Sequence, residues 1–381
     1  MGVLFSPCSR FMAEPLIAQY GPDIPVQIAH TFKQAYRKFD SEGFVTDCLN
    51  GYESLNLMQR GSHIAVALHS HLPGAYPEAI RIVLESLHAK RQHSSGSLAS
   101  FFYLPHTCFV AKYGLDHFDA SMQAQYELTQ RFTAEFSIRP FICKYPDATL
   151  ALLKEWTDDG SEHVRRLVSE GTRPRLPWAA RLPQFQKDPR PVLELLECLK
   201  DDVSPYVRRS VANNLNDIGK DHPAILVETA RSWLIDASPQ REQLVRHALR
   251  SAIKRADAAA FDAIGYGKRP QVDVQLMQVS PERPVIGGSL KLTALITSTC
   301  KTSQKLLIDL EVGYIKANGE CRTKVFKLKM IELAPNEAFH LTRKISLAQM
   351  TTRTHYPGRH TLALIINGQH YPLTEVEVGA C

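Results

Sequence analysis

The stretch that decides the fold of the helical part is Ser204-Pro-Tyr-Val-Arg-Arg-Ser-Val-Ala-Asn-Asn-Leu-Asn-Asp-Ile-Gly-Lys220. Its apolar residues recur every three or four positions, which is the period of one helix face: Val207, Val211, Leu215 and Ile218. The opposite face is expected to hold the polar residues Arg209, Asn213, Asn216, Asp217 and Lys220. We therefore predict an amphipathic helix with one packed side and one free, partly basic side.

The beginning of this stretch has copies elsewhere in the chain. Ser161-Glu-His-Val-Arg-Arg166 recurs 43 residues later as Ser204-Pro-Tyr-Val-Arg-Arg209, and Val245-Arg-His247 is a weaker copy 38 residues further on. These spacings are close to the period of HEAT and armadillo repeats, about 40–47 residues. Such repeats stack pairs of helices and leave a curved surface free. The sequence therefore predicts an α-α superhelix of HEAT-like repeats.

Alignment of the copies predicts what the free surface carries. One residue of each copy falls at the same position: Arg166, Arg209 and His247. Four residues later come Glu170, Asn213 and Ser251. A ridge of arginines can bind phosphates bidentately. The alternative is a solvated face with pairs inside one helix, such as Arg166 with Glu170, and the spacing alone leaves both open.

The hydrophobic period changes along the chain. Up to about residue 268 it is helical, as in Val26, Ile28 and Phe32. After Pro270 the hydrophobic period is two residues, as in a β-strand: Ile308, Leu310, Val312 and Tyr314 alternate with Asp309 and Glu311. The Asn-Gly pairs at 318–319 and 367–368 suit tight hairpin turns. About seven short strands indicate an immunoglobulin-like β-sandwich. We therefore predict a multidomain chain, α then β, with helical repeats in residues 1–268 and the sandwich in 269–381.

The composition limits the classes of protein that this chain can belong to. Its 381 residues are 44% hydrophobic, which excludes a disordered chain, and 45 Lys+Arg against 39 Asp+Glu give a net charge of only +6. No run of about 18 apolar residues exists, so we expect no membrane partner. The eight cysteines are scattered without a C-x-x-C pair, which favours reduced thiols in the cytoplasm and no metal site.

A proline-rich segment, Gly171-Thr-Arg-Pro-Arg-Leu-Pro-Trp-Ala-Ala-Arg-Leu-Pro183, presents one indole among three arginines. A rigid loop with an aromatic ring and cations suits contact with a sugar, a base or a phosphate, which makes Trp178, Arg173 and Arg175 candidates. The alternative is that Trp178 anchors the loop on the core. Trp156 and Trp233 fall on apolar helix faces and are expected in the core.

Carboxylates are the only candidates for chemistry. Asp217, among amides and arginines, should stay ionised, although it can also be a surface acid that balances Lys220. Glu135 stands four residues before Arg139, so a salt bridge within a helix is its alternative. The chain has no G-x-S-x-G, H-E-x-x-H, phosphate loop or zinc pattern. Any reaction must therefore use carboxylates and water.

Two strings carry a resemblance to a known family. Leu176-Pro-Trp-Ala-Ala-Arg-Leu-Pro183 and Tyr206-Val-Arg-Arg-Ser-Val-Ala-Asn-Asn-Leu-Asn-Asp-Ile-Gly-Lys-Asp-His-Pro223 resemble the AlkC branch of the HEAT-like-repeat DNA alkylation repair enzymes, in its long form with an immunoglobulin-like domain. The resemblance implies a monofunctional, cofactor-free DNA glycosylase. It would remove 3-methylcytosine, 3-methyladenine and 1-methyladenine from duplex DNA without base flipping. Two domains around one duplex argue for a monomer, and the resemblance implies a place near the bacterial nucleoid in the cytoplasm.

The resemblance also implies roles for individual residues. The family's catalytic acids match Glu135, Glu170 and Asp217, its lesion-contacting tryptophan matches Trp178, and its backbone-gripping arginine matches Arg166. The remaining expected DNA contacts are Arg209, Asn213, His247, Arg173, Arg175 and Lys220. An alkylated base is already cationic and needs no acid to leave, so the carboxylates would stabilise the positive charge that grows on the sugar and would orient water.

Two other functions stay open at this point: a non-enzymatic binder of bent or damaged DNA, and a protein–protein adaptor built from repeats. Residues 270–381 hold 13 Lys+Arg against 9 Asp+Glu, that is +4 of the total +6. We expect its basic residues to close around the duplex: Arg322, Lys324, Lys327, Lys329, Arg343, Lys344, Arg353 and Arg359. The alternative is that they only keep strand edges soluble.

Overall fold

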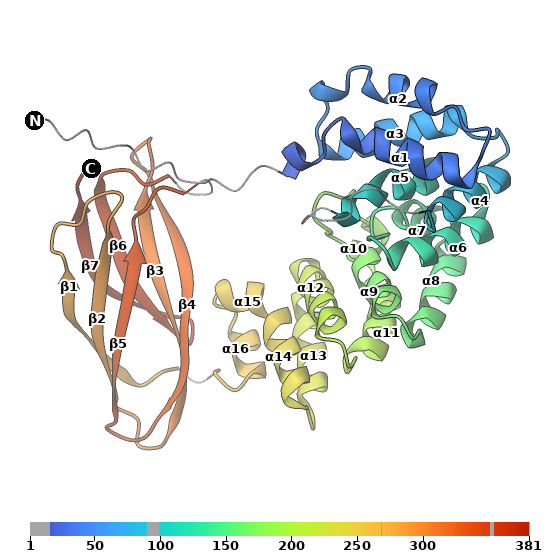
Figure 1. Ribbon diagram of the computed structural model, residues 1–381. Helices are drawn as coiled ribbons and strands as arrows, with labels where there is room; N and C mark the ends of the chain where they lie inside the picture. Colours follow the sequence, from blue (N-terminus) through green and yellow to red (C-terminus); the bar gives the residue numbers. More distant parts are fainter. Residues whose placement is uncertain (1–15, 90–98, 268, 351–353, 381) are drawn as a thin grey trace, which may run out of the picture. The chain divides into compact units, whose positions relative to one another are not determined.

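The computed structural model describes residues 16–89, 99–267, 269–350 and 354–380. The chain forms two compact units, which divide between Ile218 and Gly219 within one helix. Figure 1 labels the helices and the strands of the chain. Among the described helices, none is both long and apolar enough to cross a membrane. The six cysteines described are free thiols: Cys48, Cys108, Cys143, Cys198, Cys300 and Cys321.

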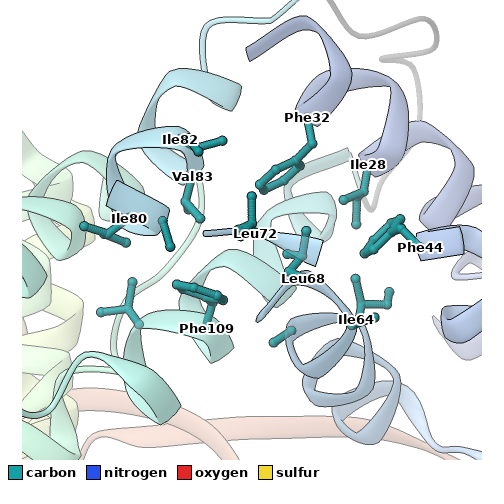
Figure 2. Close-up of a cluster of buried hydrophobic side chains, with 14 of the residues drawn as sticks. Ile28, Phe32, Phe44, Ile64, Leu68, Leu72, Ile80, Ile82, Val83 and Phe109 are labelled. Atoms are coloured by element: carbon teal, nitrogen blue, oxygen red, sulfur yellow. The ribbon is translucent and has the colours of Figure 1, made fainter. Parts of the chain in front are cut away.

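The first unit is helical. Its α-helices are α1 (Asp23–Ala35), α2 (Ser41–Leu49), α3 (Leu57–His71), α4 (Tyr76–Ser86), α5 (Leu104–Tyr113), α6 (Phe118–Thr129), α7 (Arg139–Lys144), α8 (Pro146–Glu155), α9 (Glu162–Gly171), α10 (Pro183–Lys187), α11 (Arg190–Leu199) and α12 (Pro205–Asp221), the last of which runs into the second unit. Figure 2 shows the core of the first helices, where Phe32, Leu68 and Phe109 converge. Val26 is 52% exposed, contrary to expectation, because it lies two residues from the buried Ile24 and Ile28 and so faces the other way.

The two helices with the closest sequence match begin in the same way. Before α9, the Asp159 carboxylate accepts from the amide of Ser161 at 2.7 Å, and before α12 the Asp202 carboxylate accepts from the amide of Ser204 at 2.8 Å. Arg165 Nη1 donates to the Asp159 carbonyl at 2.7 Å, and Arg208 Nη1 makes the same contact with the Asp202 carbonyl. The repeat of 43 residues is therefore structural.

The first arginine of each Val-Arg-Arg copy is used inside the repeat. Arg165 reaches the next repeat as well, where Nε lies 2.6 Å from the Asp202 carboxylate. The second arginine, Arg166 or Arg209, is left for the outer face. The first arginine of the motif therefore stabilises the repeat, and the second is available for other contacts.

The third copy is out of register. Val164 and Val207 are each the third residue of their helices, whereas α14 (Pro239–Ala248) begins at Pro239 and makes Val245 its seventh. The predicted equivalence of His247 with Arg166 and Arg209 is therefore wrong by one helical turn. Counted from the capping Ser238, His247 corresponds instead to Glu170 and Asn213.

The second unit joins the last helices to the β-sandwich. Its further elements are α13 (Pro223–Leu234), α14, α15 (Arg250–Lys254), α16 (Ala258–Ala263), β1 (Val272–Ser280), β2 (Ser289–Ser298), β3 (Gln304–Ile315), β4 (Cys321–Leu333), β5 (Ala338–Ser346), β6 (Gly358–Ile366) and β7 (Gln369–Val378). A three-stranded sheet β1-β2-β5 and a four-stranded sheet β4-β3-β6-β7, both antiparallel, enclose the apolar core. The predicted seven strands and the α-then-β fold class are confirmed.

Helix α16 packs against the sandwich at the β6–β7 turn. Gly368 there has φ +78°, and a Cβ would stand 3.0 Å from Phe261 Cε2, so both the turn and the close approach favour glycine. Helix gives way to strand between Ala263 and Val272. Residue 268 lies outside the described residues, and the division into domains 1–268 and 269–381 stays a prediction.

Candidate functional site

The first unit contains a cavity of about 610 Å³. Five of the residues singled out from the sequence line it: Glu135, Arg166, Glu170, Arg173 and Trp178. They come from the segment before α7, from α9 and from the loop that follows α9. The fold therefore brings together in one cavity four of the charged residues and the tryptophan.

Helix α12 contacts the charged residues of the cavity and the end of α9. Ser210 Oγ donates to Glu170 Oε2 at 2.6 Å, Asn214 Nδ2 donates to the Ser169 carbonyl at 2.8 Å, and Asp217 Oδ2 accepts from Arg173 Nε at 2.9 Å. The spacing of these α12 residues, four and then three, places them on one helix face. That face is held against the end of α9, so it is not solvated.

The polar face predicted for α12 is consequently only in part a free surface. Asn216 is 2% exposed and Asp217 is 1% exposed, whereas Arg209 is exposed and Asn213 half-buried. Asp217 is not a surface acid that balances Lys220. The periodicity identified the polar residues of the helix, but it could not show that Asn216 and Asp217 are buried.

The charged residues form a chain in which acids and arginines alternate. Arg166 Nη1 lies 2.8 Å from Glu135 Oε2, and its Nη2 lies 3.9 Å from Glu170 Oε1. Arg173 Nη1 lies 2.5 Å from Glu170 Oε1, and its Nη2 lies 2.8 Å from Asp217 Oδ2. Three carboxylates and two guanidinium groups give this chain a formal charge of −1.

Both arginines of the chain are held in the charged form. Burial by itself lowers the pKa of Arg166, but Glu135 and Glu170 outweigh it, and the pKa lies above its ordinary value. The pKa of Arg173 is raised in the same way, with Glu170 and Asp217 outweighing burial. The arginines therefore act as fixed positive charges.

Of the two local pairings considered from the sequence, one is replaced by a longer-range ion pair and the other is present at a longer distance. Glu135 does not pair within a helix with Arg139, because α7 begins only at Arg139. It binds Arg166 of α9 and accepts from Thr133 Oγ1 at 2.5 Å. The Arg166–Glu170 pair within α9 exists at 3.9 Å, but Arg166 lies closer to Glu135.

Trp178 lies at the rim of the cavity with its side chain largely in solvent. It is 74% exposed and has φ 65°, a left-handed conformation that is unusual for a bulky residue. The loop is anchored instead by Leu176 and Leu182, which are 4% and 1% exposed. The alternative of a core anchor is therefore wrong for Trp178, while Trp156 and Trp233, at 8% and 2%, are confirmed as core residues.

The other predicted DNA contacts are not among the residues that line the cavity. Arg175 faces α10, where the side-chain oxygen of Gln186, in the orientation that satisfies both residues, lies 2.9 Å from Arg175 Nη2. Arg209 is exposed on α12, and Asn213 is half-buried on the same helix. Lys220 and His247 belong to the second unit.

The cavity also contains aromatic residues that the sequence reading missed. The guanidinium carbon of Arg166 lies 4.8 Å from the ring centre of Tyr206, and His163 meets the same ring edge-on at 5.8 Å. A signal was present, because His163 and Tyr206 occupy the same repeat position, just before the Val-Arg-Arg copies. The element that the two repeats share is therefore an aromatic ring two residues before the pair of arginines.

The N-terminal helices form an apolar wall of the cavity. Met58 of α3, Leu104 of α5 and Phe101 line it, together with Phe132 and Phe136. Local sequence carries no signal for this wall, since its residues are far apart along the chain. An apolar wall beside the carboxylates excludes water and strengthens their field.

The comparisons with known proteins agree over nearly the whole chain. Residues 273–380 match the family described as "Uncharacterised protein YhaZ, C-terminal Ig-like domain". The uncharacterized protein YhaZ of Bacillus subtilis (strain 168) is 37% identical over 351 residues, which cover 92% of this chain and 95% of YhaZ. The Pseudomonas fluorescens alkylpurine DNA glycosylase AlkC, solved bound to DNA containing an abasic site analog, is 36% identical with a TM-score of 0.88, covering 96% of this chain and 99% of that one.

Proposed function

Because this chain belongs to the family of YhaZ and the DNA glycosylase AlkC, we propose that it hydrolyses the N-glycosidic bond of cationic N-alkylated bases in duplex DNA. Its substrates are 3-methylcytosine, 3-methyladenine and 1-methyladenine, and the base is removed without being flipped out of the helix. The chain works as a monomer, without a cofactor, and initiates base excision repair.

The observation that carries this proposal is the chain of three acids and two arginines at a cavity whose lining also includes aromatic and apolar side chains. The chain from Glu135 to Asp217 has a formal charge of −1 beside Trp178 and Tyr206. A cation is attracted to acids and to ring faces. Such a cavity suits a cationic base, and it suits even more the sugar on which charge grows as the bond breaks.

The roles of the three carboxylates follow from where they stand. Glu135 and Glu170 line the cavity, so they lie beside the sugar and orient the attacking water. Asp217 lies beneath Arg173 and neutralises it, so that Glu170 keeps its full effect on the cavity. Trp178 stacks on the lesion or its sugar. Arg166, fixed between Glu135 and Tyr206, grips the backbone.

The test is release of base from duplex DNA that contains 3-methylcytosine or 3-methyladenine, measured by mass spectrometry, with undamaged duplex as the control. We expect release from the alkylated duplexes only, and an abasic strand that stays intact until alkali is added. DNA binding without release would make the protein a non-enzymatic binder of damaged DNA. Absence of salt-dependent DNA binding would make it an adaptor.

We further propose that the β-sandwich contacts the DNA backbone. Arg322, Lys324, Lys327 and Lys329 are exposed on β4, while Arg353 lies outside the described residues. Replacing both Arg322 and Lys324 by Glu should weaken binding, and should reduce the slope of log K against log salt by roughly 2, because about one counterion is released per phosphate contact. Lys301→Glu, in the exposed β2–β3 loop, is the matched control.

Charge reversal tests this contact better than deletion of the sandwich. Deletion would uncover Phe261 of α16, which packs at the β6–β7 turn, and would change the stability of the last helices. If the double variant keeps the affinity and salt slope of the Lys301 variant, this part of the sandwich makes no contact with the backbone.

A further inference from the structure

The loop between α9 and α10 carries two residues of the site, yet has little regular structure. It contains Arg173 and Trp178, and its own backbone hydrogen bonds include those from Ala179 N to the Leu176 carbonyl at 3.3 Å and from Leu182 N to the Pro174 carbonyl at 3.2 Å. Trp178 is also held in the left-handed region. A strained conformation in such a loop persists only if surrounding contacts over-determine it.

One side chain from another element supplies these contacts. Arg139, the first residue of α7, is 4% exposed and donates four hydrogen bonds to carbonyl oxygens of this loop. Nη1 donates to Gly171 at 3.0 Å and to Arg173 at 2.8 Å. Nε and Nη2 donate to Ala180 at 3.1 and 2.5 Å. The guanidinium thus joins the beginning of the loop to its end and closes the segment that holds Trp178.

The neighbourhood is built for this close approach. A Cβ on Gly171 would stand 2.8 Å from Ile138 Cγ2, so α9 can end this near to Arg139 only with glycine. Burial lowers the pKa of Arg139 to about 10, and the group is still charged at neutral pH. Burying a charged guanidinium group costs free energy, and here its hydrogen bonds to three carbonyl groups of the loop offset that cost.

We infer that Arg139 is a positioning residue of the site: by fixing both ends of the loop 171–180, it holds Trp178 against the cavity and Arg173 between its two acids. This inference rests on the proposed function for its effect on catalysis, but the closure of the loop itself does not depend on that function. Lysine cannot replace arginine here, because it offers one nitrogen where the loop uses three.

The test compares Arg139→Lys and Arg139→Gln with Arg60→Lys. Arg60 is the matched control, because it is 5% exposed and also donates to carbonyls, those of Leu55 and Tyr20, outside the cavity. Hydrogen exchange of residues 172–182 should be faster in both Arg139 variants by about tenfold or more, with exchange in α9 and α12 unchanged. Arg60→Lys should leave this loop at the wild-type rate.

Excision provides the second measurement. Both Arg139 variants should excise about 100-fold more slowly at saturating enzyme, with half-saturation within about threefold, since a shift of 1 Å in a positioned group has that effect. In a Trp178→Ala background the same changes should cost only about threefold, because the effect through Trp178 is gone and only the effect through Arg173 remains. If Arg139→Lys does not fold, Arg139→Gln is assayed in its place, because glutamine introduces no buried charge.

The outcomes separate this inference from the proposed function. Faster loop exchange without any excision by the wild type would support the closure and reject the glycosylase. Unchanged loop exchange in both variants would overturn the inference, and so would rate losses that are equal in the presence and absence of Trp178.

Discussion

Asp217→Asn should lower base excision by about 10²–10³-fold while the protein stays folded and binds DNA as well as the wild type or more tightly. The carboxylate is 1% exposed and accepts two contacts from Arg173, at 2.9 Å to Nε and 2.8 Å to Nη2. Asparagine has the same shape and can still accept from Arg173, so the packing is kept. The formal charge of the chain of acids and arginines changes from −1 to 0, which removes stabilisation of the developing cation.

Single-turnover release of 3-methyladenine from duplex DNA measures this effect. Asp202→Asn is the matched control: the Asp202 side chain is 4% exposed and pairs with Arg165 at 2.6 Å, but Arg165, unlike Arg173, does not line the cavity. The control should lose stability and keep its excision rate within about twofold when it is folded. Excision by the Asp217 variant at the wild-type rate would remove Asp217 from the mechanism, and equal losses in both variants would make its role purely structural.

Trp178→Ala should slow excision by about 30-fold and change the free energy of unfolding by less than about 0.5 kcal/mol. The side chain is 74% exposed, so its removal leaves no cavity in the core. A ring face on a partly desolvated cation is worth about 2 kcal/mol, which corresponds to about 30-fold in rate. The loop keeps its anchors, Leu176 and Leu182.

Two further variants separate the effect of the aromatic ring face from the effect of side-chain size. Trp178→Phe keeps an aromatic face and should retain part of the rate, whereas Trp178→Leu keeps only apolar bulk and should resemble the alanine variant. The measurement is again single-turnover release, with thermal unfolding to check the fold. If the leucine variant is as active as the phenylalanine variant, packing and not charge explains Trp178; if alanine is as active as the wild type, Trp178 has no part in excision.

The two matched repeats show how one short motif serves both folding and chemistry. In each copy the first arginine, Arg165 or Arg208, closes the turn before its own helix. The second arginine of the first copy, Arg166, pairs with Glu135 and lines the cavity, whereas Arg209 of the second copy is exposed and is not a lining residue. Equivalent positions in the repeats are therefore not equivalent in function, because each repeat has different neighbours.

The sequence by itself determined the class of fold, the alternating acids and arginines of the candidate site, and Trp178. Helical and strand periods, Asn-Gly turns and the 43-residue repeat depend on contacts within one element or between neighbours, and these are readable locally. The Trp178 loop and the string that ends at Asp217 were recognisable for the same reason, since each lies in one continuous segment.

The tertiary structure alone decided how these residues are connected. Glu135 pairs with Arg166 and not with Arg139, Asp217 is buried under Arg173, and Arg139 holds the Trp178 loop by its carbonyls. A hydrophobic period fixes the direction of a side chain only around its own helix axis. Which other segment lies in that direction depends on the packing of helices far apart in the chain, and the charge of the cavity follows from that packing.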